Sequence, residues 1–124
     1  MKILVTGGAG FIASHIVDAY ISAGHDVVII DDMSKGQERN INPKAKFFKM
    51  GVQDKSLIEL FEEERFDVIN HHAAQMDVRI SVENPVFDAD VNIIGGINLF
   101  ESAKRTNVKK IIFASSGGTV YGEQ

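Results

Sequence analysis

The sequence of 124 residues contains no cysteine, no tryptophan and only two prolines, and it shows no excess of basic residues. The lack of cysteine excludes disulfide bonds and thiol catalysis and is compatible with a reducing cytoplasm. No hydrophobic run is long enough to span a bilayer, and no charged-then-apolar leader precedes the first strand-like run. We therefore expect a cytoplasmic protein without a membrane segment or a signal peptide.

The charge and the hydrophobic content limit the class of protein further. Lysine and arginine number 13 against 17 aspartates and glutamates, which gives a formal net charge of −4 without any basic block. Nucleic acids and anionic membranes are therefore poor candidates as partners. The hydrophobic content of 44% is typical of a globular protein, and the length suits one small domain over residues 1–124.

Short hydrophobic runs alternate with helical patterns along the whole chain. The runs Val27 to Ile30 and Lys110 to Phe113 are continuous, as in parallel strands that are covered on both faces. This alternation predicts an α/β fold, a doubly wound parallel sheet of the Rossmann type with strand order 3-2-1-4-5. The expected strands are residues 2–6, 26–30, 45–49, 67–72 and 109–114, and the expected helices are 10–23, 54–65 and 85–106.

Capping residues mark the ends of the first two helical patterns. Gly24 is placed to end the first helix in a left-handed conformation, and Asp54 is placed to cap the start of the second. The acidic run from Glu62 to Glu64 is interpreted as a solvated face of the second helix.

The third helical pattern, which Asn84 and Pro85 begin, has two hydrophobic faces. A helix with two apolar faces buries both, so one lies on the sheet and the other needs a partner in this chain or a second copy. Gly95 and Gly96 are costly inside a helix and predict a close backbone contact. We expect a homodimer or a larger assembly through residues 85–106. One face carries Phe87, Val91 and Ile94, and the other carries Val86, Ile93, Ile97 and Phe100.

The most informative motif is a glycine pattern, G-x-x-G-x-x-A, at Gly7, Gly10 and Ala13. It follows a hydrophobic run and begins a helical pattern, as a dinucleotide phosphate site does. There the first glycine permits the tight turn, and the second lets the backbone approach the pyrophosphate. The amides of Gly10, Phe11 and Ile12, with the helix dipole, would hold this anion. The alternative is an ordinary turn between strand and helix in a domain that binds nothing.

A carboxylate ends the second hydrophobic run, and it favours NAD over NADP. Asp31 lies 24 residues after Gly7, where it can accept hydrogen bonds from the adenosine ribose hydroxyls and would repel a 2′-phosphate. Lys35 could serve a phosphate, but the neighbouring Asp32 disfavours this. No Gly-Lys-Ser/Thr follows the glycines, so a P-loop is excluded.

Six segments carry, in order, the motifs of a known family. They are Thr6 to His15, Asp31-Asp32, His72 to Gln75, Ser81 to Pro85, Asn92 to Gly95 and Ser115 to Gly122. On these motifs the chain resembles the extended short-chain dehydrogenase/reductases, and within them the NAD-dependent nucleotide-sugar epimerases and dehydratases. The resemblance covers the whole chain and implies a Rossmann-type fold, tightly held NAD and a nucleotide-sugar substrate. It leaves the sugar open.

The resemblance also implies roles for individual residues. Carried over by position, they are Gly7, Gly10, Phe11 and Ile12 at the pyrophosphate; Asp31 with Asp32, Lys35 and Gly36 at the adenine ribose; Val52 at the adenine; and Ala73, Ala74 and Gln75 at the pyrophosphate and nicotinamide ribose. The last three follow the fourth expected strand, which agrees with the binding of ligands beyond the carboxyl ends of parallel strands.

The chain departs from the family pattern at two single positions. Gly51 stands where the family usually has an Asp that bonds the adenine amine, so adenine recognition is expected to be weaker or to use Asp54. Gly117 stands where the family usually has the Ser or Thr that bonds the reacting sugar hydroxyl. Ser116 or Thr119 is the candidate replacement.

A third departure concerns the proton-transferring pair. The Tyr-x-x-x-Lys of the family, in which the lysine lowers the pKa of the tyrosine, does not occur within the 124 residues, and the sugar-binding region is absent too. We therefore interpret the chain as the N-terminal, NAD-binding part of such an enzyme, inactive alone.

The competing functions remain open at this point. The leading hypothesis is the NAD half of a 4-epimerase that transiently oxidises C4 of a UDP-linked hexose. Gly118 and Thr119 after Gly117 favour this over a 4,6-dehydratase or decarboxylase. A third possibility is a non-catalytic NAD-sensing module. His71, His72 and Asp77 could mimic a metal cluster, but no helical H-x-x-x-H supports one, so we expect strand-end histidines and no metal.

Overall fold

The computed structural model describes residues 1–33, 36–72 and 95–113, and its centre is a parallel sheet of five strands. The spatial order is β3-β2-β1-β4-β5, which confirms the order expected from the alternating pattern. All four strand pairings are parallel, and β1 lies in the middle, between β2 and β4. The strands are β1 (Lys2–Thr6), β2 (Asp26–Asp31), β3 (Lys46–Lys49), β4 (Val68–His71) and β5 (Lys110–Phe113).

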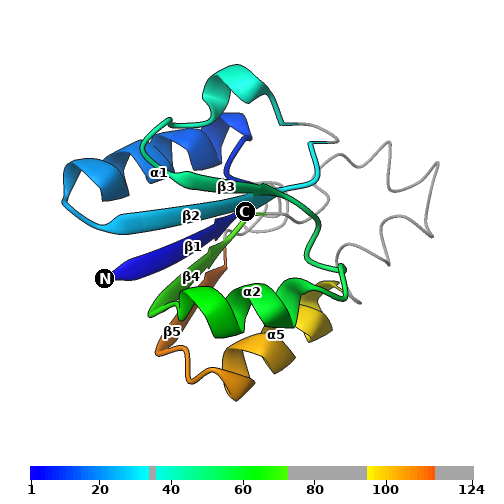
Figure 1. Cartoon of the computed structure of the whole chain (residues 1–124). Helices are drawn as coiled ribbons and strands as arrows, with labels where there is room; N and C mark the ends of the chain where they lie inside the picture. Colours follow the sequence, from blue (N-terminus) through cyan, green and yellow to red (C-terminus); the bar gives the residue numbers. More distant parts are fainter. Residues whose placement is uncertain (34–35, 73–94, 114–124) are drawn as a thin grey trace, which may run out of the picture.

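Helices cover both faces of this sheet (Figure 1). Helix α1 (Phe11–Ser22) lies on one face, whereas α2 (Leu57–Glu64) and α5 (Gly95–Arg105) lie together on the other. A short 3₁₀ helix, η1 (Glu38–Asn40), precedes β3. A hydrophobic cluster lies between the sheet and the helices on each face. The cluster under α2 and α5 includes Leu4 and Phe61, and the cluster under α1 includes Val5 and Val17. Among the helices of the described residues, none is long and apolar enough to cross a membrane.

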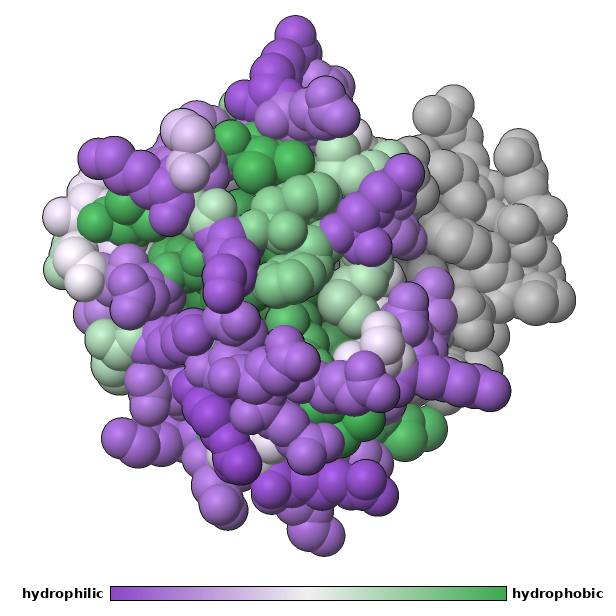
Figure 2. Space-filling view, in the orientation of Figure 1, coloured by the Kyte–Doolittle hydropathy of each residue, from purple (hydrophilic) through white to green (hydrophobic). Residues whose placement is uncertain are grey.

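The surface around the edge strand β3 is partly hydrophobic. Figure 2 shows hydrophobic side chains near the middle of this view, bordered by polar ones. Phe47 and Phe48 of β3 are only half-buried, although each packs against one of the two clusters.

Helix α1 ends as its sequence predicts. Gly24 has a φ of +89°, its N–H donates to the carbonyl of Ile21 at 3.0 Å, and the N–H of His25 donates to the carbonyl of Tyr20 at 3.1 Å. These two bonds form a Schellman motif, in which glycine takes the left-handed position without a steric penalty. The prediction for Gly24 is confirmed.

Helix α2 begins three residues later than expected, at Leu57. The carboxylate of Asp54 accepts hydrogen bonds from the backbone N–H of Ser56 at 3.0 Å and from its hydroxyl at 2.8 Å. Asp54 therefore stabilises the turn before the helix and is not its N-cap, which is Ser56. Its pKa is held below the usual value by these two hydrogen bonds, the backbone one first.

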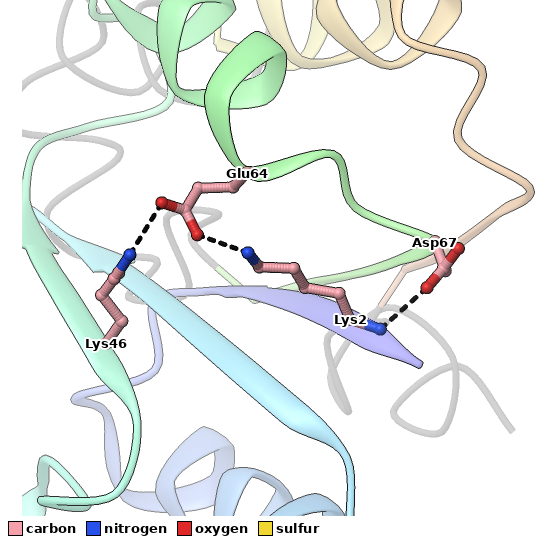
Figure 3. A network of polar contacts seen from close by, with 4 residues as sticks. All are labelled: Lys2, Lys46, Glu64 and Asp67. Carbon is pink, nitrogen blue, oxygen red and sulfur yellow. Dashed lines mark hydrogen bonds and ion pairs between the residues drawn. The ribbon is translucent and has the colours of Figure 1, made fainter.

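The acidic run of α2 is not a uniformly solvated face, so that interpretation is wrong for one residue. Glu62 and Glu63 are exposed, but the Glu64 side chain is 8% exposed. Its carboxylate lies 2.7 Å from Nζ of Lys2 and 2.9 Å from Nζ of Lys46, between the beginnings of two strands (Figure 3). Hydrogen bonds from Lys2 first, and then from Lys46, hold the pKa of Glu64 below its usual value.

The described part of the third expected helix is α5, and residues 85–94 of the expectation lie outside the described residues. Leu99 is fully buried, whereas Ile97 is 60% and Phe100 48% exposed, so this part of the helix has the expected second apolar face. A Cβ on Gly96 would meet no atom within 4 Å, so the described part of the chain makes no close backbone contact at that residue; a close contact with a second copy stays a prediction.

Candidate functional site

The glycine motif forms a tight turn between β1 and α1. Gly7 has a φ of +71°, a conformation that suits glycine, and its N–H donates to the carbonyl of Ile30 at 2.7 Å. The N–H of Gly10 donates back to the carbonyl of Gly7 at 3.0 Å. This turn places the amino end of α1 beyond the carboxyl edge of the sheet.

The first amides of α1 precede the hydrogen bonds of the helix. The first of these bonds runs from Ser14 N–H to the carbonyl of Gly10 at 2.9 Å. The N–H groups of residues 11–13 therefore have no partner within the helix, and they stand at its positive dipole end. Phe11 and Ile12 are 74% and 66% exposed, so this helix end is accessible. An anion there would receive several backbone hydrogen bonds.

A glycine that sequence reasoning missed brings the turn close to the sheet. A Cβ on Gly8 would lie 2.6 Å from Cγ2 of Ile29, a buried residue of β2. Gly7 and Gly10 could be predicted because their spacing matches the G-x-x-G-x-x-A motif. The need for glycine at position 8 comes from a neighbour that is distant in sequence, so no local signal indicated it.

Asp31 ends β2 beside this turn and is 8% exposed. Its Oδ2 accepts a hydrogen bond from the N–H of Ala9 at 3.0 Å, and its Oδ1 accepts one from Met33 N–H at 2.8 Å. Each carboxylate oxygen can accept about two hydrogen bonds, so capacity for two more remains. Asp31 thus holds the glycine turn in place and still offers acceptors at the site where the sequence predicts the ribose.

The segment after β2 is docked on the same turn through Ala9. The carbonyl of Ala9 accepts hydrogen bonds from Gln37 N–H and from Nδ2 of Asn40, both at 3.1 Å. Gly36 lies so close that a Cβ on it would be 2.7 Å from Cβ of Ala9 and 2.9 Å from Oδ2 of Asp31. Asp32 is exposed, and Lys35 lies outside the described residues.

The loop after β3 is held from α5. The side-chain amide of Asn98 donates to the carbonyl of Val52 at 2.7 Å and to that of Asp54 at 2.8 Å. The side chain of Val52 is 1% exposed and packs in the hydrophobic cluster under α2. That it lines an adenine pocket stays a prediction. Asn98 is a site residue that sequence reasoning missed, because a helical asparagine has no distinguishing spacing.

His71 ends β4 and His72 follows it, both beside Thr6, the last residue of β1. The Thr6 hydroxyl lies 2.6 Å from Nδ1 of His71 and accepts a hydrogen bond from the N–H of His72 at 2.8 Å. Burial first, and the neighbouring His72 second, lower the pKa of His71 to about 4; burial also lowers the pKa of His72. His71 is thus a buried, strand-end histidine, as expected, and the described residues include no group of three potential metal ligands.

Several predicted site residues cannot be compared with the structure. Ala73, Ala74, Gln75 and Asp77, and the candidates Ser116, Gly117 and Thr119, lie outside the described residues. Their roles stay predictions.

Fold and site together define a dinucleotide-binding α/β protein of the Rossmann type: a glycine turn leads into the amino end of a helix, with an acid at the end of the next strand. Residues 3–124 match the model of the NAD dependent epimerase/dehydratase family. The chain belongs to this family, which confirms the resemblance seen in its motifs and agrees with NAD as the expected cofactor.

Several solved structures and curated proteins that resemble the chain carry the name of UDP-glucose 4-epimerase. The UDP-glucose 4-epimerase of Thermotoga maritima, solved with UDP-glucose, matches with a TM-score of 0.94 and 45% identity. This match covers 100% of the present chain and 40% of the epimerase chain. That of Thermus thermophilus, in complex with NAD, has a TM-score of 0.90 at 42% identity over 94% of this chain and 38% of its own.

Among the curated proteins, the UDP-glucose 4-epimerase of Mycolicibacterium smegmatis is 44% identical over 98% of this chain and 41% of its own length. A protein of Methanocaldococcus jannaschii with a provisional assignment as the same enzyme is 53% identical over 98% of this chain and 40% of its own. The chain thus spans about 40% of the length of these relatives.

Proposed function

We propose that these 124 residues are the NAD-binding part of a UDP-glucose 4-epimerase. The observation that carries the proposal is the position of Asp31, whose carboxylate is fixed beside the glycine turn and has acceptor capacity left. The relatives at 44% and 45% identity that carry this enzyme name support the choice of reaction and of UDP-glucose as substrate.

The described residues fit a dinucleotide in two places. The accessible amides at the start of α1, together with the backbone of the turn from Gly7 to Gly10, form the pyrophosphate site that we propose. The remaining acceptor capacity of Asp31 serves the adenine ribose, with Asp32 and the loop at residues 35–36 beside it. Because a carboxylate at this point repels a 2′-phosphate, NAD is preferred over NADP.

The chain's own residues contribute binding and orientation. When bound, NAD supplies a hydride acceptor for the sugar carbon, and the epimerisation that we propose inverts C4. Asp31 fixes the glycine turn through Ala9, and the docked segment after β2 fixes Ala9 from the other side. The site is therefore preorganised, which lowers the entropic cost of cofactor binding.

We also propose that copies of the protein associate through α5. Ile97 and Phe100 are exposed to about half or more of their surface, on the face of α5 for which the sequence pattern predicts a contact with a second copy. Exposed hydrophobic side chains that adjoin on a helix are typical of contact surfaces.

Two measurements test the proposed function. The first is titration of the chain with NAD and NADP, with NAD expected to bind more tightly; equal or tighter NADP binding would contradict the cofactor assignment. The second is conversion of UDP-glucose to UDP-galactose, measured for the 124 residues and for the product of the complete reading frame. Conversion by the latter supports the epimerase. Formation of a 4-keto-6-deoxy sugar would indicate the dehydratase, and NAD binding without turnover would indicate a sensing module.

A further inference from the structure

The loop that follows β3 carries a side-chain amide that the described part of the chain does not use. Gln53 is half-buried, and its carboxamide makes no hydrogen bond to any described residue. It folds back over Gly51: a Cβ on Gly51 would lie 2.5 Å from Oε1 and 2.9 Å from Nε2 of Gln53. The lack of a side chain at position 51 therefore provides the space that this carboxamide occupies.

The backbone on both sides of Gln53 is fixed. The carbonyls of Val52 and Asp54, its two neighbours, accept hydrogen bonds from the same side-chain amide of Asn98, at 2.7 and 2.8 Å. On one side the chain is further held by the burial of Val52. A restrained loop thus presents this carboxamide, which is the arrangement that a specific binding contact requires.

The position of this loop points to the base of the cofactor. The segments that follow β1, β2 and β3 all leave the same edge of the sheet (Figure 1). With the pyrophosphate at the β1 turn and the ribose at Asp31 after β2, the base continues toward the next strand in the order, β3. The loop after β3 is residues 50–56, which contain Gln53.

We propose that Gln53 is the adenine-recognising residue of this site, with its Oε1 accepting a hydrogen bond from the 6-amino group; the inference rests on the proposed NAD-binding function. A glutamine carboxamide matches adenine because the base offers a donor at N6 beside an acceptor nitrogen. The nearby carboxylate of Asp54 is a poorer match, because an ionised carboxylate only accepts hydrogen bonds and has no donor for the acceptor nitrogen of the base.

The test removes the carboxamide of Gln53 by substitution and the 6-amino group of adenine by the use of an NAD analogue. The probes are NAD and the analogue in which unsubstituted purine replaces adenine, titrated against the chain and its variants. The wild type should bind NAD about threefold to tenfold more tightly than the purine analogue, as one hydrogen bond predicts. Gln53→Leu should bind both with equal affinity, whereas Gln53→Glu, which retains the acceptor, should keep the preference for NAD.

A matched control is Ser22→Leu, at the exposed carboxyl end of α1 and away from this edge of the sheet, which should retain the wild-type ratio. Because the readout is a ratio between two ligands, a general loss of stability does not imitate the effect. An unchanged ratio in Gln53→Leu, with NAD still bound by the wild type, overturns the inference and leaves the proposed function standing. Failure of the wild type to bind NAD overturns both.

Discussion

The hydroxyl of Thr6 and Nδ1 of His71 lie 2.6 Å apart, and this contact joins the carboxyl ends of the neighbouring strands β1 and β4. The same hydroxyl oxygen accepts the N–H of His72. Which of the two atoms, Oγ1 or Nδ1, donates in the contact is set by the tautomer of the ring. Burial of this histidine next to the glycine turn lowers its pKa and so favours the neutral imidazole.

Acid should destabilise the fold through His71. Its pKa is about 4 in the folded chain against about 6.5 in the unfolded one. As the pH falls from 6.5 to 4, His71 binds a proton in the unfolded state but stays neutral in the folded state, so the free energy of unfolding decreases. The loss from this group is on the order of 3 kcal/mol and is complete below pH 4. Urea unfolding between pH 7 and 4.5 measures it.

The variant His71→Gln should weaken this pH dependence, and His15→Gln, at an exposed position, should not. The same pH dependence in His71→Gln as in the wild type would mean that other groups are responsible.

The buried carboxylate of Glu64 should contribute to stability, because it pairs with Lys2 and Lys46. Glu64→Gln removes the charge and should reduce the free energy of unfolding by about 1–2 kcal/mol. Because its pKa is lowered in the folded state, the contribution is present above the usual pKa of a glutamate and is lost as the pH falls below it. Glu63→Gln, at an exposed position of the same helix, should change stability by less than about 0.5 kcal/mol.

Asn98→Leu should loosen the loop after β3, because one side chain restrains the carbonyls of both Val52 and Asp54. Two backbone acceptors lose their donor, so we expect a loss of about 1–3 kcal/mol in unfolding free energy together with weaker NAD binding. Asn42→Leu breaks two exposed hydrogen bonds, one to the carboxylate of Asp18 and one from the N–H of Lys44, and should cost less because water replaces both. Denaturant unfolding and NAD titration measure both effects. If the two variants behave alike, the restraint from α5 is unimportant.

Asp31→Ala should weaken NAD binding by about 1.5–3 kcal/mol, the value for lost hydrogen bonds to a charged group. The preference against NADP should also fall, because the repelling carboxylate is gone. Part of the effect comes from Ala9, whose N–H loses its acceptor. Asp31→Asn retains an acceptor for this N–H but removes the charge, so it should lose the discrimination against NADP and less of the NAD affinity. Unchanged discrimination in both variants would assign the preference to another residue.

The strand order and the glycine turn could be predicted because both depend on local patterns. Continuous hydrophobic runs such as Val27 to Ile30 indicate strands buried on both faces. Gly7 has the positive φ that suits the tight turn of the glycine motif. The place of Asp31 at the end of β2 followed from the same reasoning.

Contacts between distant segments could not be predicted. Glu64 belongs to the same acidic run as the exposed Glu63, and it is buried because the first residues of β1 and β3 bring two lysines to it. The carboxylate of Asp54 can form the same kind of local hydrogen bond at a helix N-cap and in an isolated turn. The residues around it therefore did not distinguish a helix that begins at 54 from one that begins at 57. The restraint of Val52 by Asn98 likewise joins residues that are far apart in sequence.

Association through α5 should be sensitive to a charge on its exposed face. Ile97 is 60% and Phe100 48% exposed, and their spacing places them one turn apart on the same side of the helix, where they form an apolar strip. A glutamate in the middle of such a contact would lose its hydration without gaining a partner for its charge. The free-energy cost of burying this charge disfavours association. Ile97→Glu should therefore shift the chain toward the monomer in sedimentation at micromolar concentration, while Ser22→Glu, at the exposed end of α1 on the other face of the sheet, should not. A wild type that sediments as a monomer, unchanged by Ile97→Glu, would show that this face is not a contact between copies.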